Sequence, residues 1–96
     1  MKVKVWNYGQ YSSDNYGVHT MGFTDAYGND YYFSYRTLVA FRTKGNLYVR
    51  ENVWGTTTGK HLNWIDGGDK KNRLSKEDFE NMMNNLLGVR SVELVA

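Results

Sequence analysis

Alternating apolar and polar residues fill the first two thirds of the chain, and this period of two is typical of β-strands that bury one face. Asp25–Asn29, with the sequence DAYGN, has the composition of a turn, because Gly28 can adopt a positive φ angle. A second turn is predicted at Lys44–Asn46 (KGN), and Gln10–Gly17 has the composition of a polar connection. The pattern therefore predicts four strands, over Lys2–Tyr8, Val18–Thr24, Tyr31–Thr43 and Leu47–Trp54.

The last two predicted strands form a hairpin whose register decides which side chains share a face. If KGN is a three-residue loop, Thr43 pairs with Leu47, and Arg42 then faces Tyr48. This register collects apolar residues such as Phe41 on one face, and a shift of one residue would move every side chain to the opposite face. The other face would carry cations and aromatic residues: Arg36, Arg42, Arg50, Tyr48 and Trp54.

The last third of the chain contains the pattern of an amphipathic helix over Ser75–Leu87. Ser75 has the position of an N-cap with Asp78 three residues later, and Gly88 is placed to end the helix. Acidic residues in the first turn also suit the positive end of the helix dipole. The apolar stripe that would pack on the sheet consists of Phe79, Met82, Met83, Leu86 and Leu87.

After this helix, the alternation of Val92, Leu94 and Ala96 predicts one more strand that returns to the sheet. The expected fold is therefore α+β: an antiparallel sheet of four to five strands with one C-terminal amphipathic helix packed on one face. At 96 residues, the chain has the length of a single small domain, so we expect residues 1–96 to fold as one unit.

The composition favours a soluble protein of the cytoplasm. No apolar run approaches the roughly 20 residues that span a bilayer, and the first residues lack the apolar core of a secretion signal. The chain has no cysteine, which fits a reducing compartment. A net charge of +2 is too small by itself to indicate nucleic-acid binding. The 8 Tyr, 4 Phe and 3 Trp exceed what one small core can hide, so some should lie at the surface, where such residues often anchor interfaces.

The stretch Thr56–Arg73, TTTGKHLNWIDGGDKKNR, combines hydroxyls, glycines, a histidine and cations. It does not match the phosphate-binding P-loop, because His61 follows the Gly-Lys pair where Ser or Thr is required. Aligned as an EF-hand, it places cations where calcium ligands belong. Its histidine has no second histidine or cysteine at a zinc-binding spacing. We therefore expect neither a metal nor a cofactor.

A structural interpretation of this stretch is that Thr57 or Thr58 caps a short helical turn. That turn would carry Leu62 and Ile65 into the core. An anion site built from the threonine hydroxyls, nearby backbone N–H groups and a lysine is the alternative. His61 is the one residue of the stretch that could act as a general base. We expect the structural turn and no enzymatic activity. In this interpretation the polar side chains of the stretch contribute to recognition, so His61→Ala should leave the free energy of unfolding nearly unchanged and at most weaken partner binding.

The same stretch would hold further polar side chains beside the basic aromatic face of the hairpin. A basic loop next to such a face can bind phosphate backbones or stacked bases. It equally suits an acidic protein surface, which tyrosine and arginine side chains can anchor. The predicted partner-binding residues are Arg36, Arg42, Tyr48, Arg50, Trp54, Lys60, His61, Lys70, Lys71 and Arg73.

Two segments resemble small proteins of unknown function from phages and mobile elements of Gram-positive bacteria. The first is Asn15–Phe41, with NYG and the motif FSYRTLVAF, and the second is Thr57–Glu80, with TTGKHLN and DGGDKK. The resemblance implies no particular activity. It implies a context in which accessory proteins of this size antagonise host machinery, including nucleic-acid-targeting defence such as CRISPR.

The function expected from the sequence is therefore that of a non-enzymatic inhibitor or adaptor. Such a protein would bind a host protein complex in the host cytoplasm, without a membrane, a metal or a cofactor. The alternative is a small nucleic-acid-binding protein that uses the basic aromatic face of the hairpin.

Overall fold

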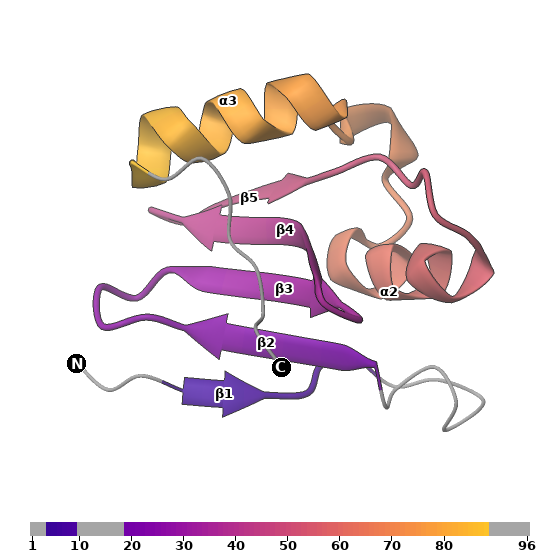
Figure 1. The fold of residues 1–96 in the computed structure, drawn as a ribbon, viewed down its shortest axis with the longest axis horizontal. Coiled ribbons are helices and arrows are strands. Elements are labelled where there is room, and N and C mark those ends of the chain that lie inside the picture. Colours follow the sequence, from indigo (N-terminus) through magenta and orange to yellow (C-terminus); the bar gives the residue numbers. More distant parts are fainter. Residues whose placement is uncertain (1–3, 10–18, 89–96) are drawn as a thin grey trace.

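The computed structural model describes residues 4–9 and 19–88. These residues form an antiparallel sheet in the order β1-β2-β3-β4-β5, with two α-helices and a short 3-10 helix (Figure 1). The α+β architecture expected from the sequence is confirmed. The predicted connection over 10–17 and the predicted last strand within 89–96 lie outside the described residues. The elements are β1 Lys4–Trp6, β2 Thr20–Thr24, β3 Asp30–Ser34, β4 Thr37–Thr43, β5 Asn46–Val49, α2 Thr56–Asp66, η1 Lys70–Asn72 and α3 Lys76–Leu87.

The predicted strand Tyr31–Thr43 is in fact two strands, β3 and β4, joined by a two-residue turn. Ser34 pairs with Thr37, so Tyr35 and Arg36 make the turn, and Tyr35 has a φ angle of 57°. This left-handed conformation is uncommon for an aromatic residue. The prediction of one long strand is wrong. The sequence gives no sign of the turn, because neither of its residues is a glycine, proline or asparagine, the residues that usually mark a turn.

The turn between β4 and β5 contains two residues instead of three, which shifts the predicted register by one. Lys44 and Gly45 have φ angles of 53° and 81°, and a pair of positive angles is what a type I′ hairpin requires. Phe41 consequently pairs with Tyr48. The predicted register is wrong because this tighter turn has a twist that matches the twist of the flanking strands.

Strand β5 ends at Val49, earlier than the predicted end at Trp54, because the chain then pairs with the segment that precedes α3. The N–H of Leu74 donates to the carbonyl of Val49 at 2.7 Å, and the N–H of Glu51 donates to the carbonyl of Leu74 at 2.8 Å. These bonds occupy part of the β5 edge. The residues after Glu51 are thereby directed away from the sheet toward the start of α2.

Apolar residues pack on both faces of the sheet, because successive residues of β3 point to opposite sides. On one face, Phe33 belongs to the cluster that includes Phe79 of α3. On the other face, Tyr32 belongs to the cluster that includes Leu62 of α2. Figure 1 shows α3 along the β5 side of the sheet and α2 beside the β3–β4 turn. The sheet therefore has a helix packed on each face.

Helix α3 begins and ends where the local sequence predicts. The side-chain oxygen of Ser75 accepts a hydrogen bond from the N–H of Asp78 at 3.2 Å, and Gly88 ends the helix with a φ angle of 72°. Phe79 and Met83 are buried against the sheet, and the other apolar residues of the stripe are partly buried beside them. The predicted amphipathic helix and its packing are confirmed.

Candidate binding pocket at the start of helix α2

The segment Thr56–Asp66 forms a complete helix, α2, rather than the short turn expected from the sequence. Gly55 is the N-cap residue and no side chain caps the helix, so neither threonine expected to do so performs that role. Leu62 is fully buried, and Ile65 packs against the same cluster. The predicted anchor in the core is confirmed, although the element that it anchors is longer than predicted.

His61 lies in the core, where it joins a buried network of polar side chains. Its side chain is 0% exposed, and its Nδ1 atom lies 2.7 Å from the hydroxyl oxygen of Ser34. The same hydroxyl of Ser34 lies 2.9 Å from the hydroxyl of Thr58. The expectation that His61 is a surface residue available to a partner is therefore wrong. The hydrophobic side of α2 carries this histidine inward together with Leu62.

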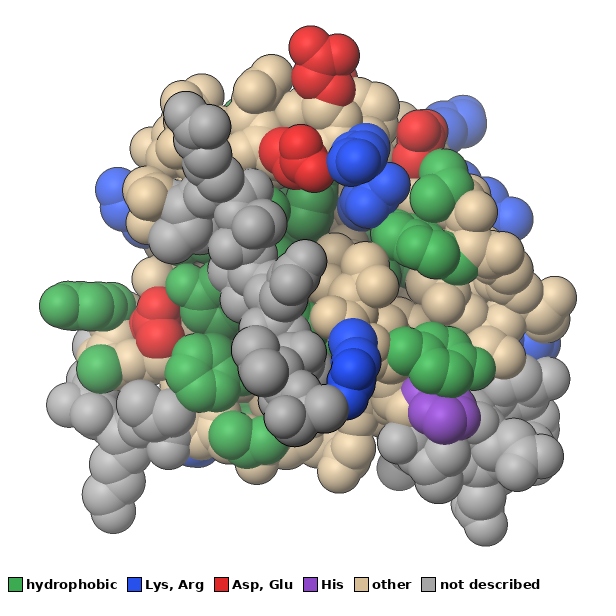
Figure 2. Space-filling model, viewed as in Figure 1, with side chains coloured by type: hydrophobic (Ala, Val, Ile, Leu, Met, Phe, Trp, Pro, Cys, Tyr) green, Lys and Arg blue, Asp and Glu red, His purple; other side chains and the backbone are tan. Residues whose placement is uncertain are grey.

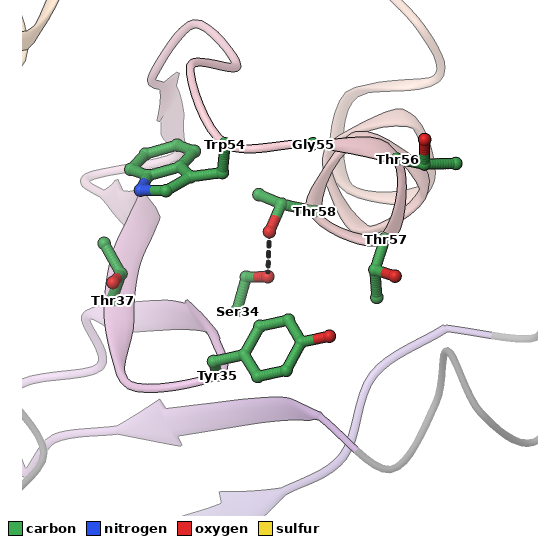
Figure 3. Close-up of a pocket in the computed structure, with 8 residues that line it drawn as sticks. All are labelled: Ser34, Tyr35, Thr37, Trp54, Gly55, Thr56, Thr57 and Thr58. Carbon is green, nitrogen blue, oxygen red and sulfur yellow. Dashed lines mark hydrogen bonds between the residues drawn. The ribbon is translucent and has the colours of Figure 1, made fainter.

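A pocket of about 410 Å³ opens where the β3–β4 turn meets the start of α2. In Figure 3 the hydrogen-bonded hydroxyls of Ser34 and Thr58 lie between the rings of Trp54 and Tyr35. Both hydroxyl-bearing residues are buried, whereas Tyr35 is 48% exposed and Trp54 is 40% exposed. The pocket therefore has a buried polar floor and two accessible aromatic walls. Its lining residues are Ser34, Tyr35, Thr37, Trp54, Gly55, Thr56, Thr57 and Thr58.

The Trp54 wall is held in place by its own loop. The side-chain carbonyl of Asn52 accepts hydrogen bonds from the N–H groups of Trp54 at 3.0 Å and Gly55 at 3.3 Å. Its side-chain amide donates to the carbonyl of Gly55 at 3.0 Å. The guanidinium of Arg50 lies 4.5 Å from the centre of the Trp54 ring, within the range of a cation–π interaction. An exposed tryptophan supported in this way loses little conformational freedom when it binds.

The Tyr35 wall is supported from the other side by an aromatic stack. The rings of Tyr35 and His19 lie 4.1 Å apart and are inclined by 20°. The turn conformation of Tyr35 and this stack together direct its ring away from the sheet and toward the pocket (Figure 3). Both aromatic walls are thus positioned by neighbouring residues before any ligand is bound.

The electrostatic character of the pocket favours negative charge. None of the residues described as lining it carries a charged side chain, and the first turn of α2 contains no acidic residue. Gly55 supplies no side chain to the first N–H groups of the helix, which also form the positive end of the helix dipole. A carboxylate from this protein therefore does not compete with a bound anion inside the pocket.

Three of the predicted partner-binding residues adjoin this pocket. Trp54 lines it, and Arg50 stacks on the Trp54 ring. Arg36 is exposed and lies in the chain between the lining residues Tyr35 and Thr37. Lys60 is exposed on α2, two residues after Thr58, which lines the pocket.

The remaining predicted residues do not form one basic aromatic face. Tyr48 pairs with Phe41 and stacks on its ring at 5.0 Å, on the face that α3 covers. Arg42 pairs with Leu47 and lies opposite Asp30 of β3. The continuous face predicted from the three-residue loop is therefore wrong, because the shifted register separates Tyr48 from Arg42. Lys70 and Lys71 are exposed in η1, outside the residues that line the pocket.

Arg73 is engaged within the protein rather than presented to a partner. Its Nε atom lies 2.7 Å from a carboxylate oxygen of Asp66, and the two side chains are only 4% and 7% exposed. Burial is the largest single influence and acts to raise the pKa of Asp66, but the hydrogen bonds from Arg73 and from the N–H groups of Gly68 and Asp69, together with the charge of Arg73, outweigh it in sum and hold the pKa below its ordinary value. This ion pair joins the end of α2 to the segment that precedes α3, so Arg73 is a structural cation.

Sequence patterns did not identify several residues of the pocket. Ser34, Tyr35 and Thr37 lie within the motif FSYRT, which reads as the middle of a strand. Only the turn at Tyr35 brings them to the end of the sheet beside α2. The signal that could have found them is the group of hydrophilic side chains at Ser34, Arg36 and Thr37, which interrupts an otherwise apolar and aromatic run.

Within residues 4–9 and 19–88, no group of three or more histidine, aspartate or glutamate side chains is placed to hold a metal ion. No helix of the described part is long and apolar enough to cross a bilayer.

No curated protein and no solved structure matches this chain. A family model does match it, over residues 3–81, and that range contains every element that builds the pocket. The chain therefore belongs to the DUF8033 family, a family of unknown function.

Proposed function

We propose that this protein is a non-enzymatic binding protein that docks on a protein partner through the pocket between Tyr35 and Trp54. The observation that carries this proposal is the pair of aromatic walls, about half exposed and each held by neighbouring residues. Exposed tryptophan and tyrosine side chains with little freedom to lose are typical anchors of protein interfaces. On the face drawn in Figure 2, hydrophobic side chains reach the surface with lysine and arginine side chains among them.

The distribution of cations favours a protein partner over nucleic acid. A protein that follows a phosphate backbone needs a continuous track of cations and aromatic platforms. Here Arg73 is paired with Asp66, and Tyr48 lies under α3. The cations that remain exposed are therefore dispersed. Nucleic-acid binding stays as the alternative, with Arg36 and Arg50 as its contacts.

The position of His61 argues against an enzyme. A general base must reach the proton that it removes, directly or through one water molecule. His61 is fully buried, and its Nδ1 atom contacts the buried hydroxyl of Ser34. A structural role as a satisfied buried polar group accounts for this geometry without chemistry.

The resemblance to small proteins of phages and mobile elements supports a more specific form of the proposal. In it, the partner is a host complex in the bacterial cytoplasm that targets foreign nucleic acid, such as a CRISPR effector, and binding inhibits that complex.

The test is affinity capture from bacterial host lysate, with and without nuclease treatment, followed by a binding measurement with the purified captured protein. We expect one protein to be retained after nuclease treatment and to bind the purified chain directly. Trp54→Ala should weaken that binding, whereas Tyr27→Ala should not, because Tyr27 is 84% exposed in the distant β2–β3 turn. Retention that nuclease abolishes would favour the nucleic-acid alternative, and retention of no partner at all would contradict the proposal.

A further inference from the structure

We infer that the pocket between Tyr35 and Trp54 takes an acidic segment of the partner protein that presents one aromatic side chain. The aromatic ring would lie between the two walls, and the flanking carboxylates would face Arg36 and Arg50. This inference rests on the proposed function and adds the chemistry of the segment that the pocket recognises.

The aromatic part of the inference follows from the shape and lining of the pocket. Its volume of about 410 Å³ exceeds the space that one side chain fills and suits a short segment of chain. Trp54 and Tyr35 line the pocket, and in Figure 3 their rings lie on opposite sides of the Ser34–Thr58 pair. Aromatic pairs gain free energy beyond that of burying their area, so an aromatic side chain suits these walls best.

The acidic part follows from charge complementarity. Among residues 4–9 and 19–88, the ion pair found joins Asp66 and Arg73, so neither Arg36 nor Arg50 is neutralised by a described carboxylate. The guanidinium of Arg50 is fixed over the Trp54 ring, and Arg36 is exposed beside Tyr35. Arg36 lines a neighbouring hollow that shares Tyr35 with the pocket, and Arg50 contacts the Trp54 wall. Carboxylates that flank the bound aromatic side chain would therefore meet positive charge next to each wall, and no acidic side chain is among the residues that line the pocket.

The buried floor of the pocket adds selectivity for the aromatic group over a polar one. The hydroxyls of Ser34 and Thr58 already satisfy each other and, through Ser34, the ring of His61. Because these hydroxyls are already hydrogen-bonded within the protein, the floor needs no polar group from the ligand. An apolar ring can cover the floor without leaving a buried donor or acceptor unpaired.

A protein segment fits these observations better than single-stranded nucleic acid. A stacked base would use the same walls, but the phosphates on either side of it need further cations along the strand. The side chain of Arg73 is buried in its ion pair, and Arg42 lies opposite Asp30. Positive charge is therefore available beside the pocket and not along a path that leads away from it.

The test uses a short capped peptide of aspartates and glutamates around one central phenylalanine. Two matched peptides replace the phenylalanine with alanine or the acidic residues with lysine, and an oligothymidylate serves as the nucleic-acid probe. Binding is followed by NMR through the indole N–H signals of the three tryptophans. We expect the acidic aromatic peptide to shift the Trp54 signal more than those of Trp6 and Trp64, and to bind more weakly as salt increases.

The protein variants separate the two parts of the inference. Trp54→Ala should weaken binding of this peptide by about tenfold or more, and Arg36→Glu by about threefold at low salt. The matched controls Tyr27→Ala and Lys44→Glu change an exposed aromatic residue and an exposed cation far from the pocket, and should leave binding unchanged. Circular dichroism of each variant checks that the fold is retained.

Equal binding of the lysine peptide, stronger binding of the oligothymidylate, or no binding of the acidic aromatic peptide would overturn the inference. Its failure differs from failure of the proposed function. If a captured protein partner binds wild type and Trp54→Ala equally, the pocket is not the docking site although a partner exists. If no partner is captured while the peptide still binds at Trp54, the preference of the pocket for an acidic aromatic segment is supported and the proposed function is contradicted.

Discussion

The hydroxyl oxygen of Ser34 in β3 lies 2.7 Å from Nδ1 of His61 in α2, and both side chains are buried. This contact joins the sheet to the helix at the floor of the pocket. Thr58 extends the contact, because its hydroxyl lies 2.9 Å from that of Ser34. The position of α2, and with it the shape of the pocket, therefore depends on a hydrogen-bond network among buried side chains.

Removal of one member of this network should destabilise the protein. Ser34→Ala leaves buried polar atoms of His61 and Thr58 without this partner, which should lower the free energy of unfolding by about 1–3 kcal/mol. Burial of His61 likewise revises the expectation from sequence that His61→Ala leaves stability unchanged, and this variant should also be destabilised. Urea unfolding followed by circular dichroism measures both effects. Thr56→Ala, which removes an exposed hydroxyl from the same helix, is the control; an equal loss in the control would contradict the role of the network.

The two apolar clusters should each be needed for stability. Phe79→Ala removes a buried ring from the cluster under α3, and Leu62→Ala empties a fully buried site under α2. Large-to-small substitutions of this kind cost about 2–5 kcal/mol, because they lose transfer free energy and leave a cavity. Thermal and urea unfolding measure the loss. Glu80→Ala changes an exposed residue next to Phe79 and should have little effect. A Leu62→Ala protein as stable as wild type would show that α2 is not packed as described.

The ion pair between Asp66 and Arg73 should make stability depend on acidic pH. The pKa of Asp66 is held below its ordinary value of 3.8 in the folded state. A lowered pKa means that the unfolded chain binds a proton more readily, so the contribution of Asp66 is complete above pH 3.8 and is lost as pH falls through the folded pKa. Asp66→Asn should therefore be less stable than wild type at neutral pH, and this difference should shrink in acid. Urea unfolding at a series of pH values tests the slope, with Glu80→Gln as the control for a surface carboxylate.

Gly22 should be required for the packing of β1 on β2. Gly22 pairs with Trp6, and a Cβ atom added at Gly22 would lie 2.4 Å from carbons of the Trp6 ring. Gly22→Ala should force that ring to move and should lower the free energy of unfolding by about 1–3 kcal/mol. The NMR signal of the Trp6 indole N–H would report the displacement. Gly55→Ala is the matched control, since a Cβ atom there meets nothing within 4 Å. Equal stability of the two variants would show that the Trp6 ring adjusts freely.

The sequence by itself determined the elements whose cause is local. Ser75 and Gly88 bound α3 because a cap and a left-handed glycine act within one turn of the helix. The apolar stripe of α3 predicts its buried face for the same reason, since helical spacing places those residues on one side. Alternation likewise predicts that most of the first half is sheet.

Tertiary structure decided the register, the second helix and the pocket. The number of residues in the Lys44–Gly45 turn depends on the twist of the strands that it joins, and one residue of difference moved Tyr48 to the opposite face. Tyr35 has a positive φ angle although it is not a glycine. The free-energy cost of that backbone conformation must be offset by contacts such as the stack of Tyr35 on His19. The walls of the pocket come from Tyr35 and Trp54, which are far apart in the chain and meet only because α2 packs against the end of the sheet. Local patterns report what neighbours in sequence prefer, whereas a site between two elements depends on contacts that form only once both are packed.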